Sequence, residues 1–125
     1  MMNVLLVAIG GAIGASLRHF VNLASLRLAP SNFPWGTMAI NIVGSLAMGI
    51  FVELLARRFN ASNELRLFVA TGILGGFTTF SAFSLDFALL WQRGEVAPAL
   101  FYAIGSVVLS ILALFAGLWL ARAIS

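Results

Sequence analysis

The sequence predicts an all-α membrane protein with four transmembrane helices, the third of which is broken in the middle of the membrane. The 125 residues are 62% hydrophobic and 9% charged, which is more apolar surface than a soluble domain of this size can bury. Charge-free runs near the length that spans hydrocarbon lie at Met1–Leu17, Leu28–Val52, Leu67–Leu85 and Val96–Ala121. The third run also carries glycines and hydroxyl residues that weaken a helix.

The four runs predict helices over roughly 3–27, 35–58, 62–92 and 96–123, joined by short connections. Together they account for residues 1–125 as a single four-helix domain. In the first helix, Gly10 and Gly14 are four residues apart, as are Gly11 and Ala15. Such small-residue ridges let two helix backbones approach closely, so we expect a tightly packed bundle.

The second helix follows a connection, Ala29–Gly36, in which two prolines prevent regular helix. Trp35 suits the aromatic belt at a membrane interface. Asn41 lies about one and a half turns into this helix, where an unpaired amide costs about 1–3 kcal/mol. Its N–H groups can meet an anion, or it can hold two helices together by a hydrogen bond. Both interpretations stay open.

The third helix begins near Ser62 or Asn63, either of which can cap it. Its most informative part is Gly72–Ser84, with the sequence GILGGFTTFSAFS. Serine and threonine hydroxyls can bond to their own backbone and bend a helix, and adjacent glycines leave that backbone uncovered. Non-helical backbone at membrane depth survives only where protein buries it or where it lines a polar cavity. We therefore expect this segment to handle something small and polar.

Phenylalanines recur through the same stretch at spacings of three, three and four, which predicts one helical stripe of Phe77, Phe80, Phe83 and Phe87. The edge of an aromatic ring is electropositive and can approach an anion. Phenylalanines in membrane helices also simply pack or face lipid. The neighbouring hydroxyls of Thr78, Thr79, Ser81 and Ser84 favour the functional interpretation.

The fourth helix follows the short turn Gln92–Glu95. Tyr102, Ser106 and Ser110 form a polar stripe, one turn apart, in an otherwise apolar helix. These hydroxyls could line a path, or they could bond to carbonyls four residues earlier.

The net charge of +3 comes from arginines that are scattered singly or in one pair at helix ends, which does not indicate nucleic-acid binding. With four spans, one side of the membrane holds Arg57, Arg58, Arg66 and Arg122, and the other holds Arg18, Arg27 and Arg93. Arginines in short loops set orientation, and this bias is small. The chain therefore inserts either in one orientation or in both, and two opposite copies would pair as an antiparallel dimer.

Arg18 and Asp86 are the charges nearest the membrane interior. Arg18 can snorkel to the interface or offer a positive charge to an anion, and Asp86 can pair with an arginine or line a vestibule. The middles of the first, second and fourth helices hold no acid, which argues against a proton-coupled exporter. The sequence also has no catalytic triad, metal motif or phosphate loop, so we do not expect an enzyme.

Three segments resemble the signatures of the Fluc (CrcB) fluoride channels, in order and at similar spacing. They are GGAIGASLR at Gly10–Arg18, PWGTMAINIVG at Pro34–Gly44 and TGILGGFTTFSAFS at Thr71–Ser84. The resemblance implies an antiparallel, dual-topology homodimer in the cell (inner) membrane. It further implies two passive, selective pores that let cytoplasmic fluoride leak out, with the bilayer and a second copy as the partners.

The resemblance also implies roles for individual residues. The third helix would break at Gly75–Thr79, and the backbone carbonyls of Gly75 and Thr78 would hold a central structural Na⁺. The expected pore residues are Asn41, Thr79, Phe80, Ser81, Phe83, Tyr102, Ser106 and Ser110, with Arg18 and Asp86 in the vestibule. Two positions depart from the family pattern: Ala82 stands where Thr or Ser is more common, and Asp86 stands where Glu is more common.

Two other classes of protein fit the length of the chain. A small dual-topology multidrug exporter fits the charge balance, but it needs a membrane-embedded acid that this chain lacks. An interaction protein that packs against a larger membrane complex fits the glycine ridges, and it predicts tolerance of substitutions at Asn41 or Phe80.

Overall fold

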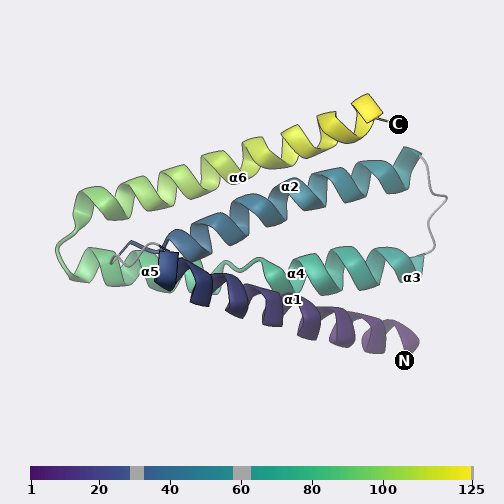
Figure 1. Cartoon of the computed structure of the whole chain (residues 1–125), viewed down its shortest axis with the longest axis horizontal. Coiled ribbons are helices and arrows are strands. Elements are labelled where there is room, and N and C mark those ends of the chain that lie inside the picture. Colours follow the sequence, from purple (N-terminus) through teal and green to yellow (C-terminus); the bar gives the residue numbers. More distant parts are fainter. Residues whose placement is uncertain (29–32, 58–62, 125) are drawn as a thin grey trace.

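The computed structural model describes residues 1–28, 33–57 and 63–124, and it is all helical. Four helical stretches in it are long and apolar enough to cross a membrane, namely Met2–Leu28, Trp35–Ala56, Asn63–Gln92 and Val96–Ile124. Both termini lie at one end of the bundle, and the turn between the last two helices lies at the other end (Figure 1). Arg58 and Ser62, which the sequence assigned to helix ends, lie outside the described residues.

The first two long helices are regular. α1 covers Met2–Leu28 and α2 covers Trp35–Arg57. The non-helical Phe33–Pro34 segment precedes α2, because proline cannot donate a backbone hydrogen bond and disfavours helix in the residue before it. The ring of Phe33 packs on Trp35 with centroids 4.4 Å apart, which orients the entry into α2.

The third stretch consists of four elements. α3 covers Asn63–Arg66, the π-helix η1 covers Leu67–Leu74, α4 covers Gly75–Phe77 and α5 covers Ser81–Gln92. The backbone N–H of Gly75 bonds to Ala70 O, five residues back, which is the hydrogen bond of a π-helix. Such wide turns are rare and are often found at functional sites.

A tight turn joins α5 to α6, which covers Val96–Ile124. Gly94 has φ +82°, the left-handed conformation that glycine adopts without strain. Its N–H bonds to Trp91 O at 3.0 Å, and the N–H of Glu95 bonds to Leu90 O at 3.0 Å. These two bonds form a Schellman motif, so α5 ends here and α6 turns back antiparallel to it.

The helices pack as two close pairs: α1 lies along η1 and α4, and α2 lies along α6 (Figure 1). Glycines allow both contacts. A Cβ on Gly14 would lie 2.1 Å from Ile73 O, and a Cβ on Gly117 would lie 2.3 Å from Leu46 O. Backbone therefore packs directly on backbone in both pairs, as the small-residue ridges predict.

The buried core is small and lies where α2, α5 and α6 meet. Met38, Leu90, Ala99 and Tyr102 form it. Many large apolar side chains are exposed on the outside, for example Ile104 at 63% and Trp119 at 66%. That distribution is typical of helices solvated by lipid rather than water.

Candidate functional site

The third stretch is interrupted between α4 and α5. Thr78 is extended, with φ −81° and ψ 158°, and Thr78–Phe80 are not helical. The Thr78 N–H and its hydroxyl both donate to Leu74 O, each at 3.0 Å. The family resemblance implied a break at Gly75–Thr79, whereas Gly75–Phe77 are helical in the structure. The helix continues to Phe77 because the Leu74 carbonyl still receives its helical donor from Thr78.

The interruption divides the predicted phenylalanine stripe. Phe77 belongs to α4, Phe83 and Phe87 belong to α5, and Phe80 lies just before α5. These four residues therefore do not form one stripe of a continuous helix, and that prediction was wrong. The extended backbone at Thr78 changes the direction of the side chains that follow it.

Asn41 on α2 holds the interrupted backbone. Its Nδ2 donates to Thr79 O at 3.1 Å, and its Oδ1 accepts from the Thr79 N–H at 3.0 Å. One side chain thus satisfies both the N–H and the carbonyl of Thr79, a residue that has left the helix. Each of these groups would otherwise cost about 1–3 kcal/mol when buried. The amide has a second Nδ2 hydrogen, which these two bonds leave available.

The Thr79 side chain starts the next helix. Its Oγ1 accepts from the Ala82 N–H at 3.3 Å and lies 3.4 Å from Ser81 Oγ. A hydroxyl that accepts from a first-turn N–H acts as a helix cap, so Thr79 ends the interruption through its side chain while its backbone stays with Asn41.

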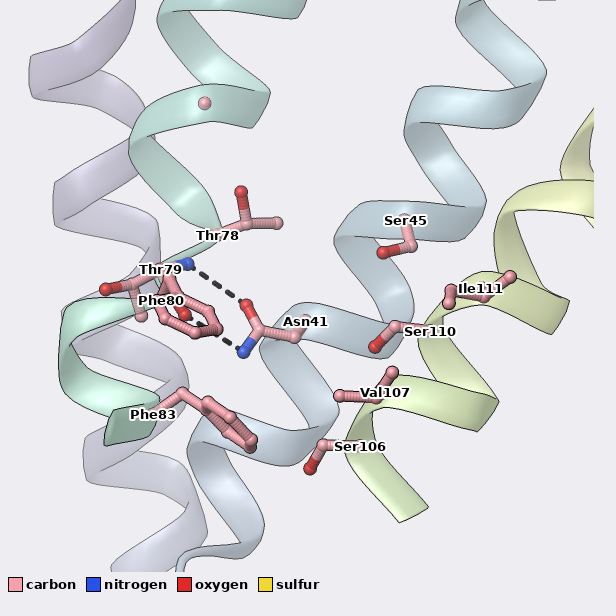
Figure 2. A pocket seen from close by; sticks show the side chains of 11 residues that line it. Asn41, Ser45, Thr78, Thr79, Phe80, Phe83, Ser106, Val107, Ser110 and Ile111 are labelled. Carbon is pink, nitrogen blue, oxygen red and sulfur yellow. Dashed lines mark hydrogen bonds between the residues drawn. The ribbon is translucent and has the colours of Figure 1, made fainter. Parts of the chain in front are cut away.

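An open pocket of about 460 Å³ lies between the interruption, α2 and α6. Its lining residues are Asn41, Ser45, Gly75, Thr78, Thr79, Phe80, Phe83, Ser106, Val107, Ser110 and Ile111. Figure 2 shows Asn41 between the Thr78–Phe80 segment and the α6 serines. This lining includes no ionisable side chain, so its polar character comes from neutral hydroxyl and amide groups.

Two hydroxyls in this pocket have no hydrogen-bond partner within the described part of the chain. Ser106 is 3% exposed, and the Oγ atoms of Ser106 and Ser110 are both buried without a partner. Of the two interpretations left open for these serines, the structure does not show bonding to carbonyls four residues earlier. Buried hydroxyls are usually satisfied, and an orphan calls for an explanation such as a missing ligand or water.

Two phenylalanines border the same pocket. The rings of Phe80 and Phe83 have centroids 5.6 Å apart with an interplanar angle of 40°. Phe80 is 75% exposed, although it lies beside polar groups and the interruption. Phe80 is therefore an exposed aromatic ring beside non-helical backbone at the mouth of the pocket.

Tyr102 and Asp86 form a separate contact outside the pocket. Tyr102 is fully buried, and its hydroxyl donates to Asp86 Oδ2 at 3.2 Å. The Tyr102 ring packs on Phe83 with centroids 5.0 Å apart. Tyr102 therefore supports the pocket from behind through Phe83 and is not among the residues that line it.

A second pocket, of about 270 Å³, lies between the end of α1, the start of α2 and α5. Its polar lining is Asn22, Ser25, Thr37 and Asp86, and Ala82 also faces it. The hydroxyl that Ala82 lacks relative to the family pattern is therefore missing from this pocket rather than from the first one. Arg18 is half-buried and lines neither pocket, and it makes no ion pair with Asp86.

The structure thus gathers most of the predicted site residues into one place. Asn41, Gly75, Thr78, Thr79, Phe80, Phe83, Ser106 and Ser110 line the first pocket, whereas Ser81, Tyr102, Arg18 and Asp86 do not. Ser45 also lines this pocket, although the sequence analysis did not name it as a site residue. Its position four residues after Asn41 on the same helix face is the signal that could have identified it.

Comparison with known proteins assigns these features to a family. The family model described as CrcB-like protein, Camphor Resistance (CrcB), matches residues 5–118. A protein of Mesorhizobium japonicum named fluoride-specific ion channel FluC is 66% identical over 124 residues, covering 99% of each chain. Proteins of the same name from Chelativorans sp. and Agrobacterium fabrum are 60% and 59% identical, covering 99% and 98% of each chain.

Proposed function

Because this chain belongs to the CrcB-like family, we propose that it is a fluoride-specific ion channel that conducts passively across a membrane. The observation that carries the proposal is the uncharged, donor-rich pocket beside the interruption, with its two unpartnered serine hydroxyls. The relatives are ion channels by name, and the lining of the pocket includes no acid or base that could activate its hydroxyls for catalysis.

The chemistry of the pocket suits a small, strongly hydrated anion. A pore must replace the water around fluoride with hydrogen-bond donors at close quarters. The second N–H of Asn41 and the hydroxyls of Ser106 and Ser110 supply such donors, and the ring edges of Phe80 and Phe83 add electropositive carbon–hydrogen groups. No carboxylate lines this pocket, so its side chains carry no negative charge that would repel an anion.

We propose that Arg18 and Asp86 lie in an outer vestibule. Asp86 lines the second pocket at the end of the bundle, and Arg18 is one turn before Asn22 on the same face of α1. Fluoride would leave the cytoplasm of the cell down its own gradient, through the inner membrane.

We further propose that two copies assemble as an antiparallel homodimer with two pores. The interruption would lie near the middle of the membrane, where backbone outside a helix must be covered by protein. A second copy would cover the exposed Phe80 and close the open side of the pocket. The small arginine bias also fits insertion in both orientations, so the two copies would be related by an axis in the membrane plane.

A central Na⁺ is the remaining part of the proposal, and the backbone fits it. In a continuous helix the Thr79 N–H would donate to Gly75 O, but here it donates to Asn41. The Gly75 carbonyl therefore lacks its helical donor, at the negative end of the α4 segment. Gly75 and Thr78 would hold the ion by their carbonyl oxygens, which are hard ligands suited to Na⁺. When bound, the cation would offset the cost of bringing an anion into low dielectric.

The test is fluoride efflux from liposomes that contain the purified protein, followed with a fluoride electrode beside a chloride control. We expect fast loss of fluoride without loss of chloride. No fluoride flux from a folded, dimeric protein would refute the channel and favour the interaction protein. Flux that depends on a proton gradient would favour an exporter instead.

A further inference from the structure

We propose that Asn41 is a positioning residue for the cation site, in addition to its role as an anion donor. By accepting the Thr79 N–H, Asn41 withholds from Gly75 O the donor that a continuous helix would supply. The inference rests on the proposed function, because it concerns the Na⁺ that this function includes. It assigns two tasks to two ends of one amide: Oδ1 keeps a carbonyl available for the cation, and Nδ2 faces the anion pocket.

The helical hydrogen bonds of the third stretch stop after Thr78. The Thr78 N–H still reaches Leu74 O at 3.0 Å, so the ladder is intact up to that residue. The next bond of the ladder would join the Thr79 N–H to Gly75 O. That N–H instead reaches Asn41 Oδ1 at 3.0 Å. The helical hydrogen bonds therefore end at Thr79, whose N–H bonds to Asn41 on α2 instead.

Asn41 reaches the third stretch because α2 approaches it closely at Gly44. Gly44 lies on α2 one turn after Asn41, and a Cβ at Gly44 would lie 2.3 Å from Thr78 Cγ2. The missing side chain lets α2 approach the interruption closely. Asn41 then binds both the N–H and the carbonyl of Thr79, which fixes the amide in one orientation. The close approach brings Oδ1 to the Thr79 N–H, and that bond keeps the N–H from Gly75 O.

The two roles proposed for Asn41 use different atoms of its amide, so substitutions can separate them. Asn41→Asp keeps an acceptor for the Thr79 N–H but removes the N–H donors and adds a negative charge. In Asn41→Leu the new side chain has a volume similar to that of asparagine, and it offers neither an acceptor nor a donor. We therefore expect the aspartate variant to lose fluoride flux and keep its response to Na⁺, and the leucine variant to lose both.

The experiment follows the thermal unfolding midpoint of the purified full-length protein as NaCl replaces N-methylglucamine chloride at constant ionic strength. A ligand that binds only the folded state stabilises it by RT ln(1 + c/Kd) at free ligand concentration c, so the rise of this midpoint with Na⁺ concentration gives an apparent Kd. The wild type should be stabilised by Na⁺. The apparent Kd for Na⁺ should stay within about threefold of the wild-type value for Asn41→Asp and rise at least about tenfold for Asn41→Leu. Ser45→Ala is the matched control, since Ser45 lines the same pocket from α2 and makes no hydrogen bond to Thr79.

The outcomes separate this inference from the proposed function. An Asn41→Leu protein that folds and responds to Na⁺ as the wild type does would overturn the positioning role and leave the channel intact. If the leucine variant does not fold, Asn41→Ala is measured instead, and an unchanged Na⁺ response in that variant overturns the inference equally. A wild type that conducts fluoride but ignores Na⁺ would refute the cation site and this inference with it. A wild type that is stabilised by Na⁺ but conducts no fluoride would refute only the channel.

Discussion

Asn41 and Thr79, which are 38 residues apart, exchange two hydrogen bonds at 3.1 and 3.0 Å. The pairing joins α2 to the point where the third membrane stretch stops being helical. Asn41 supplies hydrogen bonds to the backbone of Thr79, which has left the helix. Its amide also lines the pocket that Ser106 and Ser110 of α6 border.

The aromatic pair is testable by removing its ring edges. Phe80→Ile with Phe83→Ile should abolish fluoride efflux from liposomes, because an aliphatic side chain has no electropositive edge. The exposed Phe115 on α6 offers a matched control, and Phe115→Ile should conduct as the wild type does. Wild-type flux in a double variant that is still folded would remove the ring edges from the mechanism.

The unpartnered serines predict that function and stability respond differently. Ser106→Ala with Ser110→Ala should reduce fluoride efflux by about tenfold or more, which corresponds to losing one hydrogen bond of about 1.4 kcal/mol at the limiting step. The thermal unfolding midpoint should not fall, because a buried hydroxyl without a partner in the described chain stabilises nothing. Ser16→Ala, whose hydroxyl donates to Ala12 O on an exposed face, controls for the loss of a serine. A marked drop in the midpoint of the double variant would show that these hydroxyls are structural.

Neighbouring glycines on α1 should differ sharply. Gly14→Ala should destabilise the fold by about 1–3 kcal/mol, because its Cβ would lie 2.1 Å from Ile73 O and 2.7 Å from Phe77 N. Gly11→Ala is the matched control. A Cβ there meets nothing within 4 Å, so the variant should be neutral or up to about 1 kcal/mol more stable. Thermal unfolding in detergent measures both, and equal losses in the two variants would contradict the packing of α1 on α4.

The Tyr102–Asp86 hydrogen bond should brace α6 against α5. Tyr102→Phe leaves the buried ring in place and should cost about 1.5–3 kcal/mol of stability, the range for a hydrogen bond to a charged group. A double-mutant cycle with Asp86→Leu measures the coupling. Additive losses in the cycle would mean that the 3.2 Å contact contributes nothing to the fold.

Local pattern was sufficient for the membrane helices and for the chemistry of the important residues. Charge-free runs long enough to span hydrocarbon predicted the four apolar helices that the structure contains, because a bilayer demands length and apolarity that any one segment must satisfy alone. Asn41, Ser106 and Ser110 stood out for the same reason, since polar groups in such a segment need a partner or a use. The prediction of one phenylalanine stripe failed because it assumed that helical periodicity continued through Thr78.

The tertiary structure decided what periodicity could not. The helix ends at Phe77 rather than before Gly75 because Asn41, on another helix, takes the Thr79 N–H, and no property of the third stretch alone specifies that residue. The close approach of Gly44 to Thr78 decides how far into the bundle the amide reaches. The sequence by itself determined which segments enter the membrane and which side chains must be satisfied there. Only the packing of α2 and α6 against the interruption decided which of those side chains share a pocket, because partners distant in the chain are chosen by helix contacts and not by local spacing.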